Sequence, residues 1–262
     1  MFKIRIWVLF LMVFLFSGAR GAMAQGIPMT WQVDGVQREA IVFAPKNEKP
    51  GEKHPLVFGF HGHGGNMNAA ARGMHFQDLW PEAIVVYPQG LPTVSRIDPA
   101  GLKPGWQTEA GQNGDRDLKF FDAMLGDLKK KYKVDEKRIY SAGFSNGSIF
   151  SYLLWADRAK TIAAIGVCTG RMSASVQPTE PKPVIFIGGE TDRLVPLADL
   201  QANLETIRKI DQATGTAQSC GPMCSSYASK VNAPVMAYFH PGGHVFPPWA
   251  AQAYVDFFKS QK

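Results

Sequence analysis

The most constraining feature of this sequence is the pentapeptide Gly143-Phe144-Ser145-Asn146-Gly147. An apolar run over residues 139–142 precedes it, and a helix-like segment over residues 148–155 follows it. A serine between a strand and a helix, with a glycine two residues away on each side, is typical of a sharp, strained turn. The five-residue pattern alone is weak, and its strand–turn–helix setting carries the prediction. We therefore expect Ser145 at the tip of such a turn, with its hydroxyl exposed for reaction.

The first 24 residues have the pattern of a secretory signal peptide. Lys3 and Arg5 precede an apolar run over residues 6–16, and Ala22-Met23-Ala24 supplies the small residues of a cleavage site. An apolar run of this length is too short to cross a bilayer comfortably. We expect cleavage near Ala24, a secreted or periplasmic location, and no stable membrane anchor after cleavage.

The charge balance gives little support for a nucleic-acid partner. The full chain has 28 Lys and Arg against 22 Asp and Glu, a net charge of +6. Residues 1–24 contain three of these basic residues and none of the acidic ones. Residues 25–262 therefore have 25 basic against 22 acidic residues, a net charge of +3. The dense basic run Lys129-Lys130-Lys131 lies beside Asp127 on a predicted helix, which is typical of a solvated helix end.

Residues 25–262 suit one α/β domain, with no linker, low-complexity tract or internal repeat to divide them. We expect the first two strands to pair as a hairpin and the others to form a mostly parallel sheet of about eight strands, flanked by helices. Apolar runs predict strands over residues 29–33, 38–44, 56–60, 83–87, 139–143, 163–167, 184–187 and 235–239. The helices are predicted over residues 68–79, 115–131, 148–155, 197–211 and 248–259.

Five segments of the sequence resemble those of the α/β-hydrolase fold. They cover residues 55–65, 85–88, 143–147, 189–196 and 242–244. More narrowly, they resemble the secreted esterases described as polyhydroxybutyrate depolymerase-like and feruloyl esterase-like. The resemblance extends over about residues 37–258 and implies a serine ester hydrolase. Nothing in the sequence implies a metal or an organic cofactor.

A serine esterase needs a base to activate the hydroxyl and an acid to orient the base. In the α/β-hydrolase fold both follow the serine, the acid first and the histidine last. Asp192 lies on the loop after the apolar strand 184–187 and is the predicted acid, with Glu190 and Asp199 as alternatives. His244 follows a flexible Pro-Gly-Gly segment, matches the Gly-Gly-His pattern of the resembling family, and is the predicted base.

The other histidines are assigned different places. His240 is expected to end the last strand as a structural residue. His54 precedes a strand and is expected to be exposed, while His75 falls within a predicted helix. His61 and His63 belong to a glycine-rich loop with a separate role.

That loop, His61-Gly62-His63-Gly64-Gly65, resembles the His-Gly motif of lipases and esterases. The tetrahedral intermediate of ester cleavage carries an oxyanion, which needs preorganised hydrogen-bond donors. We expect the backbone N–H of Asn146 to be one donor and that of His63 to be the other, with Gly62 as the alternative to His63. The resembling family often has cysteine where His63 stands, but a backbone donor does not depend on that side chain.

The cysteines suggest a disulfide rather than a metal or redox site. Cys220 and Cys224 enclose Gly-Pro-Met, and in an exported protein they are expected to pair across that turn. Cys168 ends an apolar strand and is expected to be a buried free thiol, although its pairing with one of the others stays open.

The substrate cleft is expected to be open. Only about fifteen residues separate the strands predicted at 163–167 and 184–187, too few for a large helical cap domain. The irregular segment 90–114 is expected to shape the cleft, and Trp106, Phe246 and Trp249 to form an aromatic platform for an acyl or phenolic group. An alternative is that these aromatic residues only cover the core.

Together these features predict a secreted serine esterase with the triad Ser145, Asp192 and His244. The expected substrates are short-chain or hydroxycinnamoyl (feruloyl-type) esters. The alternative is a depolymerase of polyhydroxybutyrate or hydroxyalkanoate oligomers, although we expect no polymer-binding module after the last helix. A peptidase or a catalytically inactive binding protein on the same fold is less favoured.

Overall fold

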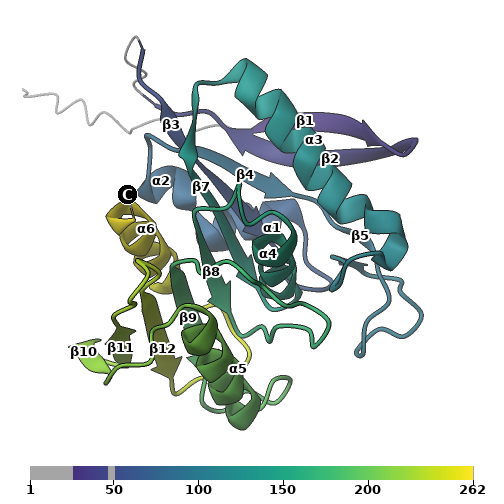
Figure 1. Cartoon of the computed structure of the whole chain (residues 1–262). Coiled ribbons are helices and arrows are strands. Elements are labelled where there is room, and N and C mark those ends of the chain that lie inside the picture. Colours follow the sequence, from purple (N-terminus) through teal and green to yellow (C-terminus); the bar gives the residue numbers. More distant parts are fainter. Residues whose placement is uncertain (1–25, 47–50, 262) are drawn as a thin grey trace, which may run out of the picture.

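The computed structural model describes residues 26–46 and 51–261 (Figure 1). The expected signal segment, residues 1–24, lies outside these described residues. Within them, ten strands form one sheet in the order β1-β2-β4-β3-β7-β8-β9-β12-β11-β10. These strands are β1 (Ile27–Val33), β2 (Val36–Phe43), β3 (His54–Phe60), β4 (Ile84–Pro88), β7 (Val134–Phe144), β8 (Ala164–Cys168), β9 (Val184–Gly189), β10 (Gln218–Gly221), β11 (Cys224–Tyr227) and β12 (Val235–His240).

The centre of the sheet is parallel, as the sequence predicts. β4, β3, β7, β8, β9 and β12 run in the same direction, and β1 and β2 form the expected antiparallel hairpin at one edge. Every residue of β3, β4, β8 and β9 is buried, whereas β1 has mostly exposed residues. Continuous apolar runs are needed here because helices cover both faces of the parallel strands.

Two groups of helices cover the two faces, and Figure 1 shows α3, α4 and α5 together in front of the sheet. Their apolar side chains share one core, and those of α1, α2 and α6 share a second core on the other face. The helices are α1 (Met67–Met74), α2 (Phe76–Leu79), α3 (Arg116–Lys131), α4 (Asn146–Asp157), α5 (Leu197–Ile210) and α6 (Ala250–Ser260). None of the helices in the described ranges is long and apolar enough to cross a membrane.

The structure corrects the expectations about two histidines. The helix predicted over residues 68–79 is divided at His75, whose φ of 30° lies in the left-handed region. The Tyr87 hydroxyl accepts a hydrogen bond from the Phe76 N–H at 2.9 Å and so holds the start of α2 away from the line of α1. His54 is the first residue of β3 and is buried rather than exposed, with its Nδ1 3.0 Å from the Glu82 carbonyl oxygen.

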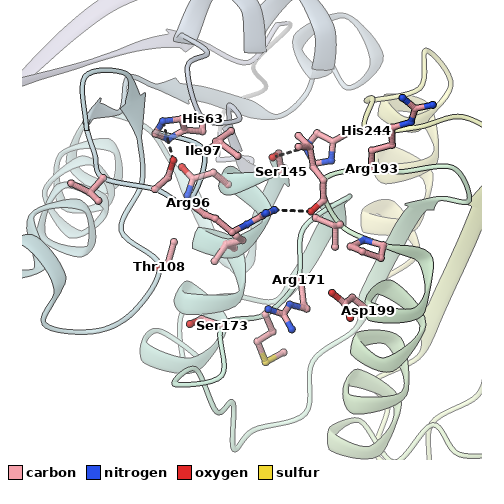
Figure 2. A pocket seen from close by; sticks show the side chains of 18 residues that line it. His63, Arg96, Ile97, Thr108, Ser145, Arg171, Ser173, Arg193, Asp199 and His244 are labelled. Atoms are coloured by element: carbon pink, nitrogen blue, oxygen red, sulfur yellow. Dashed lines mark hydrogen bonds between the residues drawn. The ribbon is translucent and has the colours of Figure 1, made fainter. Parts of the chain in front are cut away.

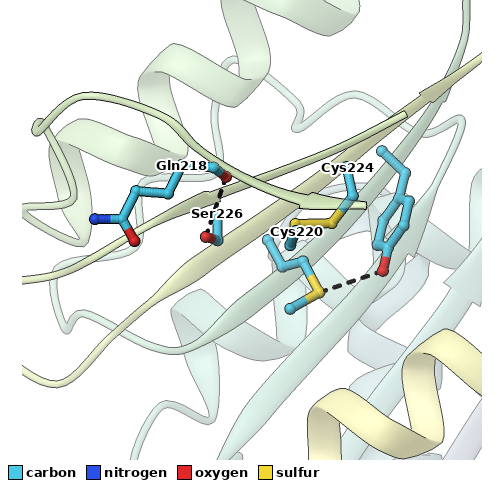
Figure 3. The surroundings of a disulfide bond; sticks show 6 residues. Gln218, Cys220, Cys224 and Ser226 are labelled. Carbon is cyan, nitrogen blue, oxygen red and sulfur yellow. Dashed lines mark hydrogen bonds between the residues drawn. A yellow bond between two sulfur atoms is a disulfide. The ribbon is translucent and has the colours of Figure 1, made fainter. Parts of the chain in front are cut away.

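A hairpin that the sequence does not reveal extends the sheet beyond the predicted eight strands. β10 and β11 pair antiparallel, and a disulfide joins Cys220 to Cys224 across their turn (Figure 3). All four residues of β10 are exposed, so the strand has no apolar alternation to mark it. Cys168 is a buried free thiol, and burial raises its pKa well above the ordinary range.

A buried carboxyl lies where α5 ends. Asp211 is fully buried, and its Oδ1 accepts a hydrogen bond from the Lys182 N–H at 2.9 Å. Its Oδ2 has no partner among the described residues. Burial raises the pKa of Asp211 to about 8 from an ordinary value of 3.8. Because the folded state holds the proton that the unfolded state loses, this residue should lower stability as the pH rises from about 4 to about 8.

We predict that Asp211→Asn raises the melting temperature more at pH 8.5 than at pH 5, with a difference of at least about 3 °C between the two gains. An amide cannot ionise, and it retains an oxygen to accept the Lys182 N–H. Thermal unfolding followed by circular dichroism at the two pH values measures this. Asp127→Asn, on an exposed part of α3, is the control and should show no such dependence. An equal gain at both pH values would contradict the prediction.

Candidate active site

Ser145 lies at a sharp turn between β7 and α4. Its backbone has φ 55° and ψ −118°, a strained conformation for a residue with a side chain. The glycines on either side permit the close packing around it. A Cβ on Gly143 would overlap the Gly147 carbonyl group, and a Cβ on Gly147 would overlap the carbonyl oxygen of Phe60 in β3. The Ser145 N–H donates to the Cys168 carbonyl oxygen at 2.8 Å, which fixes the turn to the end of β8.

The structure brings Ser145, His244 and Asp192 into one hydrogen-bonded chain. His244 Nε2 lies 2.7 Å from the Ser145 Oγ, and its Nδ1 lies 2.8 Å from Asp192 Oδ2 (Figure 2). The other carboxylate oxygen of Asp192 accepts the N–H groups of Leu194 and Val195 at 2.8 and 2.9 Å. With the Nδ1 proton directed at the carboxylate, Nε2 is left to accept the serine proton.

The alternative residues are not brought to Ser145 in this way. Glu190 is exposed, and its N–H donates to the His240 carbonyl oxygen. His240 ends β12 as a buried residue whose Nδ1 accepts the Gly242 N–H at 3.0 Å. Asp199 lies in α5, as expected, and lines the cleft without bonding to His244.

The loop after β3 packs directly against Ser145. A Cβ on Gly62 would lie 3.3 Å from the Ser145 Cβ, so this position has little room for a side chain. The next residue, His63, has a backbone N–H without an acceptor among the described residues. That N–H is therefore available to a ligand, as an oxyanion donor must be.

His61 holds the loop in place. Its Nδ1 donates to the Gly62 carbonyl oxygen at 2.8 Å, and its Nε2 accepts the Gly90 N–H at 3.0 Å. Burial lowers the pKa of His61, so the ring stays neutral and keeps both bonds at neutral pH. His61 thus connects the loop after β3 to the segment after β4.

The His63 side chain has a role that the sequence did not suggest. Its Nε2 lies 3.1 Å from Asp98 Oδ2 and 3.3 Å from the Ser95 hydroxyl. Asp98 also accepts the Lys103 N–H at 2.8 Å, and this bond, with the contact to His63, lowers the pKa of the Asp98 carboxyl. The imidazole therefore ties the loop after β3 to residues 95–103. No periodicity or motif in the sequence links these residues.

Trp106 does not form part of an aromatic platform, so this expectation is wrong. Its side chain is fully buried, with its ring packed between Phe60 and Phe150. The indole Nε1 donates to the His61 carbonyl oxygen at 2.9 Å. The Trp106 backbone N–H and carbonyl both bond the Asn146 side-chain amide, at 2.7 and 3.1 Å. Trp106 supports both segments expected to donate to an oxyanion, and it does not line the cleft at Ser145.

Phe246 and Trp249 also lie outside the cleft at Ser145. Phe246 packs edge-to-face on Phe144 and lines a separate apolar cavity of about 220 Å³ beside the loop after β3. Trp249 packs against Tyr238 and His240, where it covers the sheet. The alternative, that these aromatic residues cover the core, applies to Trp106 and Trp249.

The cleft at Ser145 has a volume of about 600 Å³ and is lined mostly by loops, together with residues of α4 and α5 (Figure 2). The segment after β4 contributes to it, as expected. Two short strands, β5 (Leu91–Pro92) and β6 (Pro104–Gly105), form the base of that segment. No helix is present over residues 169–183, between β8 and β9. The lining residues are His63, Val94, Ser95, Arg96, Ile97, Thr108, Ser145, Asn146, Ile149, Arg171, Met172, Ser173, Arg193, Leu194, Val195, Pro196, Asp199 and His244.

The residues that the structure describes contain no group of three or more His, Cys, Asp or Glu side chains arranged to hold a metal ion.

Comparisons with known proteins relate this chain to esterases. It is 30% identical to feruloyl esterase C of Emericella nidulans over 167 residues, which is 63% of this chain and 58% of that protein. It is 28% identical to a bifunctional acetylxylan esterase/xylanase of Neocallimastix patriciarum over 177 residues, which is 66% of this chain and 24% of that protein. The chain thus spans less than two thirds of the length of these curated relatives. No family model matches it.

Solved structures show the same fold. A CE1 ferulic acid esterase from Anaeromyces mucronatus superposes with a TM-score of 0.59 at 14% identity, over 90% of each chain. An acetyl xylan esterase from Aspergillus awamori has a TM-score of 0.62 at 14% identity, over 89% of this chain and 99% of that one. The chain therefore has the α/β-hydrolase fold, without a cap. In sequence it is similar to feruloyl esterase C of Emericella nidulans.

We predict that Gly147→Ala destabilises the protein by at least about 3 kcal/mol or prevents folding, because its Cβ has to displace the end of β3. Gly126→Ala is a matched control on α3. No atom lies within 4 Å of a Cβ there, so the change should stabilise the protein by about 0.5–1 kcal/mol. Chemical unfolding of both variants measures the two effects. Equal stability of the Gly147→Ala variant and the parent would contradict the close packing described here.

Proposed function

We propose that this chain is a serine carboxylic-ester hydrolase that acts through an acyl-enzyme on Ser145. The observation that carries the proposal is the chain of hydrogen bonds from the Ser145 hydroxyl through His244 to the buried Asp192 carboxylate. The serine is held at a strained turn at the floor of an accessible cleft, and the relatives named above are esterases.

In the first half of the proposed reaction, the Ser145 Oγ attacks the ester carbonyl carbon while His244 Nε2 takes the hydroxyl proton. The carbonyl oxygen becomes an oxyanion, which accepts hydrogen bonds from the N–H groups of His63 and Asn146. Asn146 begins α4, so the positive end of the helix dipole adds to this stabilisation. The intermediate then expels the alcohol, which receives its proton from His244, and the acyl group remains on Ser145.

In the second half, a water molecule takes the place of the alcohol. His244 accepts a proton from the water as its oxygen attacks the acyl carbon, and a second oxyanion forms on the same donors. Breakdown of this intermediate returns the proton to Ser145 and releases the acid. Asp192 orients His244 and stabilises its charged form throughout without giving up or taking a proton.

We predict that Ser145→Ala leaves the fold intact and lowers kcat at least about a thousandfold, because the covalent route is lost. Turnover of a 4-nitrophenyl ester measures this, and a fluorophosphonate should label Ser145 in the parent protein. His244→Ala should have a comparable effect, whereas His240→Ala should act mainly on the melting temperature. Full activity in the Ser145→Ala variant, or lost activity in a folded His240→Ala variant with His244→Ala active, would overturn the assignment.

For the substrate, we propose short-chain or hydroxycinnamoyl esters. The cleft is bounded by loops with no helix over residues 169–183, and it lacks the enclosed apolar tunnel that retains long acyl chains. One relative is a feruloyl esterase and another combines acetylxylan esterase and xylanase activities.

We predict that kcat/KM is highest for acetyl to butyryl aryl esters or methyl hydroxycinnamates, and that it falls steeply beyond about eight acyl carbons. Initial rates on a panel of 4-nitrophenyl esters of increasing acyl length, together with methyl ferulate, measure the preference. Faster hydrolysis of long-chain triglycerides, or efficient clearing of crystalline polyhydroxybutyrate, would contradict this substrate class and leave the serine mechanism in place.

A further inference from the structure

Among the described residues, five of the six arginines outside the cleft at Ser145 form ion pairs. Nine arginines lie in the described ranges, and five of them form ion pairs with Asp or Glu. The other four make no ion pair with a described carboxylate, and three of those four line the cleft at Ser145. The paired residues are Arg38, Arg116, Arg138, Arg158 and Arg208, and the three at the cleft are Arg96, Arg171 and Arg193.

The three cleft arginines come from three separate loops, as Figure 2 shows. Arg96 lies on the loop between β5 and β6, Arg171 follows β8, and Arg193 follows β9. Arg96 is also held in position, because its Nη2 donates to the Leu194 carbonyl oxygen at 2.9 Å. This bond orders the side chain without neutralising its charge. Three distant parts of the sequence thus supply cations to one cleft.

Little negative charge in the cleft opposes them. Asp199 is the one carboxylate among the lining residues. Asp192 lies beneath His244 with a fully buried side chain, and its oxygens are already engaged by His244, Leu194 and Val195. Three arginines therefore line the cleft against one available carboxylate, so the charge of the cleft favours a bound anion.

We infer that the natural substrate is an ester that carries a carboxylate, in its acyl or its alcohol part, which the cleft arginines bind. This inference rests on the proposed esterase function and narrows it. A planar guanidinium group matches the two oxygens of a carboxylate, and the cleft of about 600 Å³ has room for a small ester with such a group. Each exposed ion pair between an arginine and the substrate carboxylate should change the binding affinity by up to about fivefold. Several such pairs acting together should change it by more.

Two matched pairs of esters test the inference with the full chain. In the acyl arm, the 4-nitrophenyl monoester of succinic acid is compared with 4-nitrophenyl butyrate. In the alcohol arm, 4-acetoxybenzoate is compared with its methyl ester. The quantity measured is the ratio of kcat/KM for the anionic ester to kcat/KM for the neutral one, which corrects for general losses of activity.

We predict that the double variant Arg171→Gln/Arg193→Gln lowers this ratio about tenfold in at least one arm. Arg72→Gln is the matched control, because Arg72 is also exposed and without an ion pair among the described residues, but it lies on α1 outside this cleft. It should leave the ratio within about twofold. In the parent protein, raising NaCl from about 0.02 to about 0.5 M should lower the ratio in the same arm several-fold, because salt screens exposed charges.

The outcomes separate this inference from the function on which it rests. If the parent, the double variant and Arg72→Gln share the same ratio in both arms, the carboxylate inference is wrong, while turnover of the neutral esters still supports the esterase function. If the Arg72→Gln variant lowers the ratio as much as the double variant, the effect belongs to the net charge and the inference also fails. If the parent hydrolyses none of the four esters, the proposed function and the inference both fail.

Discussion

The close approach of α4 to the end of β3 is the contact on which the rest of the site depends. At Gly147 the helix lies so near the Phe60 carbonyl oxygen that no side chain fits between them. The Phe60 and Phe150 rings pack edge-to-face across the same junction. Because β3 continues directly into His61 and Gly62, and α4 begins directly after Ser145, this one contact sets the spacing between Ser145 and the loop that faces it.

The hydrogen bonds that hold the spacing between Ser145 and the loop after β3 involve backbone groups more than charged side chains. Trp106 bonds the His61 carbonyl oxygen with its indole and the Asn146 amide with its backbone, so one buried residue supports the chain on both sides of Ser145. His61, kept neutral by burial, adds the link to Gly90. Charged side chains lie farther out, at Asp98 beside His63 and at the arginines that line the cleft. A hydrogen-bonded centre suits the positioning of reacting groups, and charged side chains at the rim suit the selection of a substrate. The two tasks can therefore be served by different residues.

Much of the fold followed from local patterns in the sequence, because buried parallel strands need continuous apolar runs and the turn at Ser145 needs its glycines. Contacts between segments that are distant in the sequence could not be predicted from these local patterns. An aromatic residue in an irregular segment has the same sequence context whether it faces solvent or the core, and Trp106 faces the core. The β10 strand is exposed along its length and has no apolar alternation, so the sequence gives no sign of it. Glu190 and Asp192 lie on the same loop, so the sequence alone leaves both as candidates for the acid. Only the structure shows that the N–H groups of Leu194 and Val195 donate hydrogen bonds to the Asp192 carboxylate.

The loop between β5 and β6 has a closed base, and side chains of its tip contact His63 and Leu194. β5 pairs with β6, and the Thr93 N–H donates to the Lys103 carbonyl oxygen at 3.0 Å, so residues 94–102 leave and return at nearly the same point. Within that tip, Val94, Ile97 and Leu102 are exposed, and Asp98 turns inward to His63. Such a tip can change in length and composition with little disturbance to the sheet beneath, provided that an inward carboxylate is kept. The same scaffold could in this way acquire new cleft walls, through variation in a segment that lies outside its ten-stranded sheet.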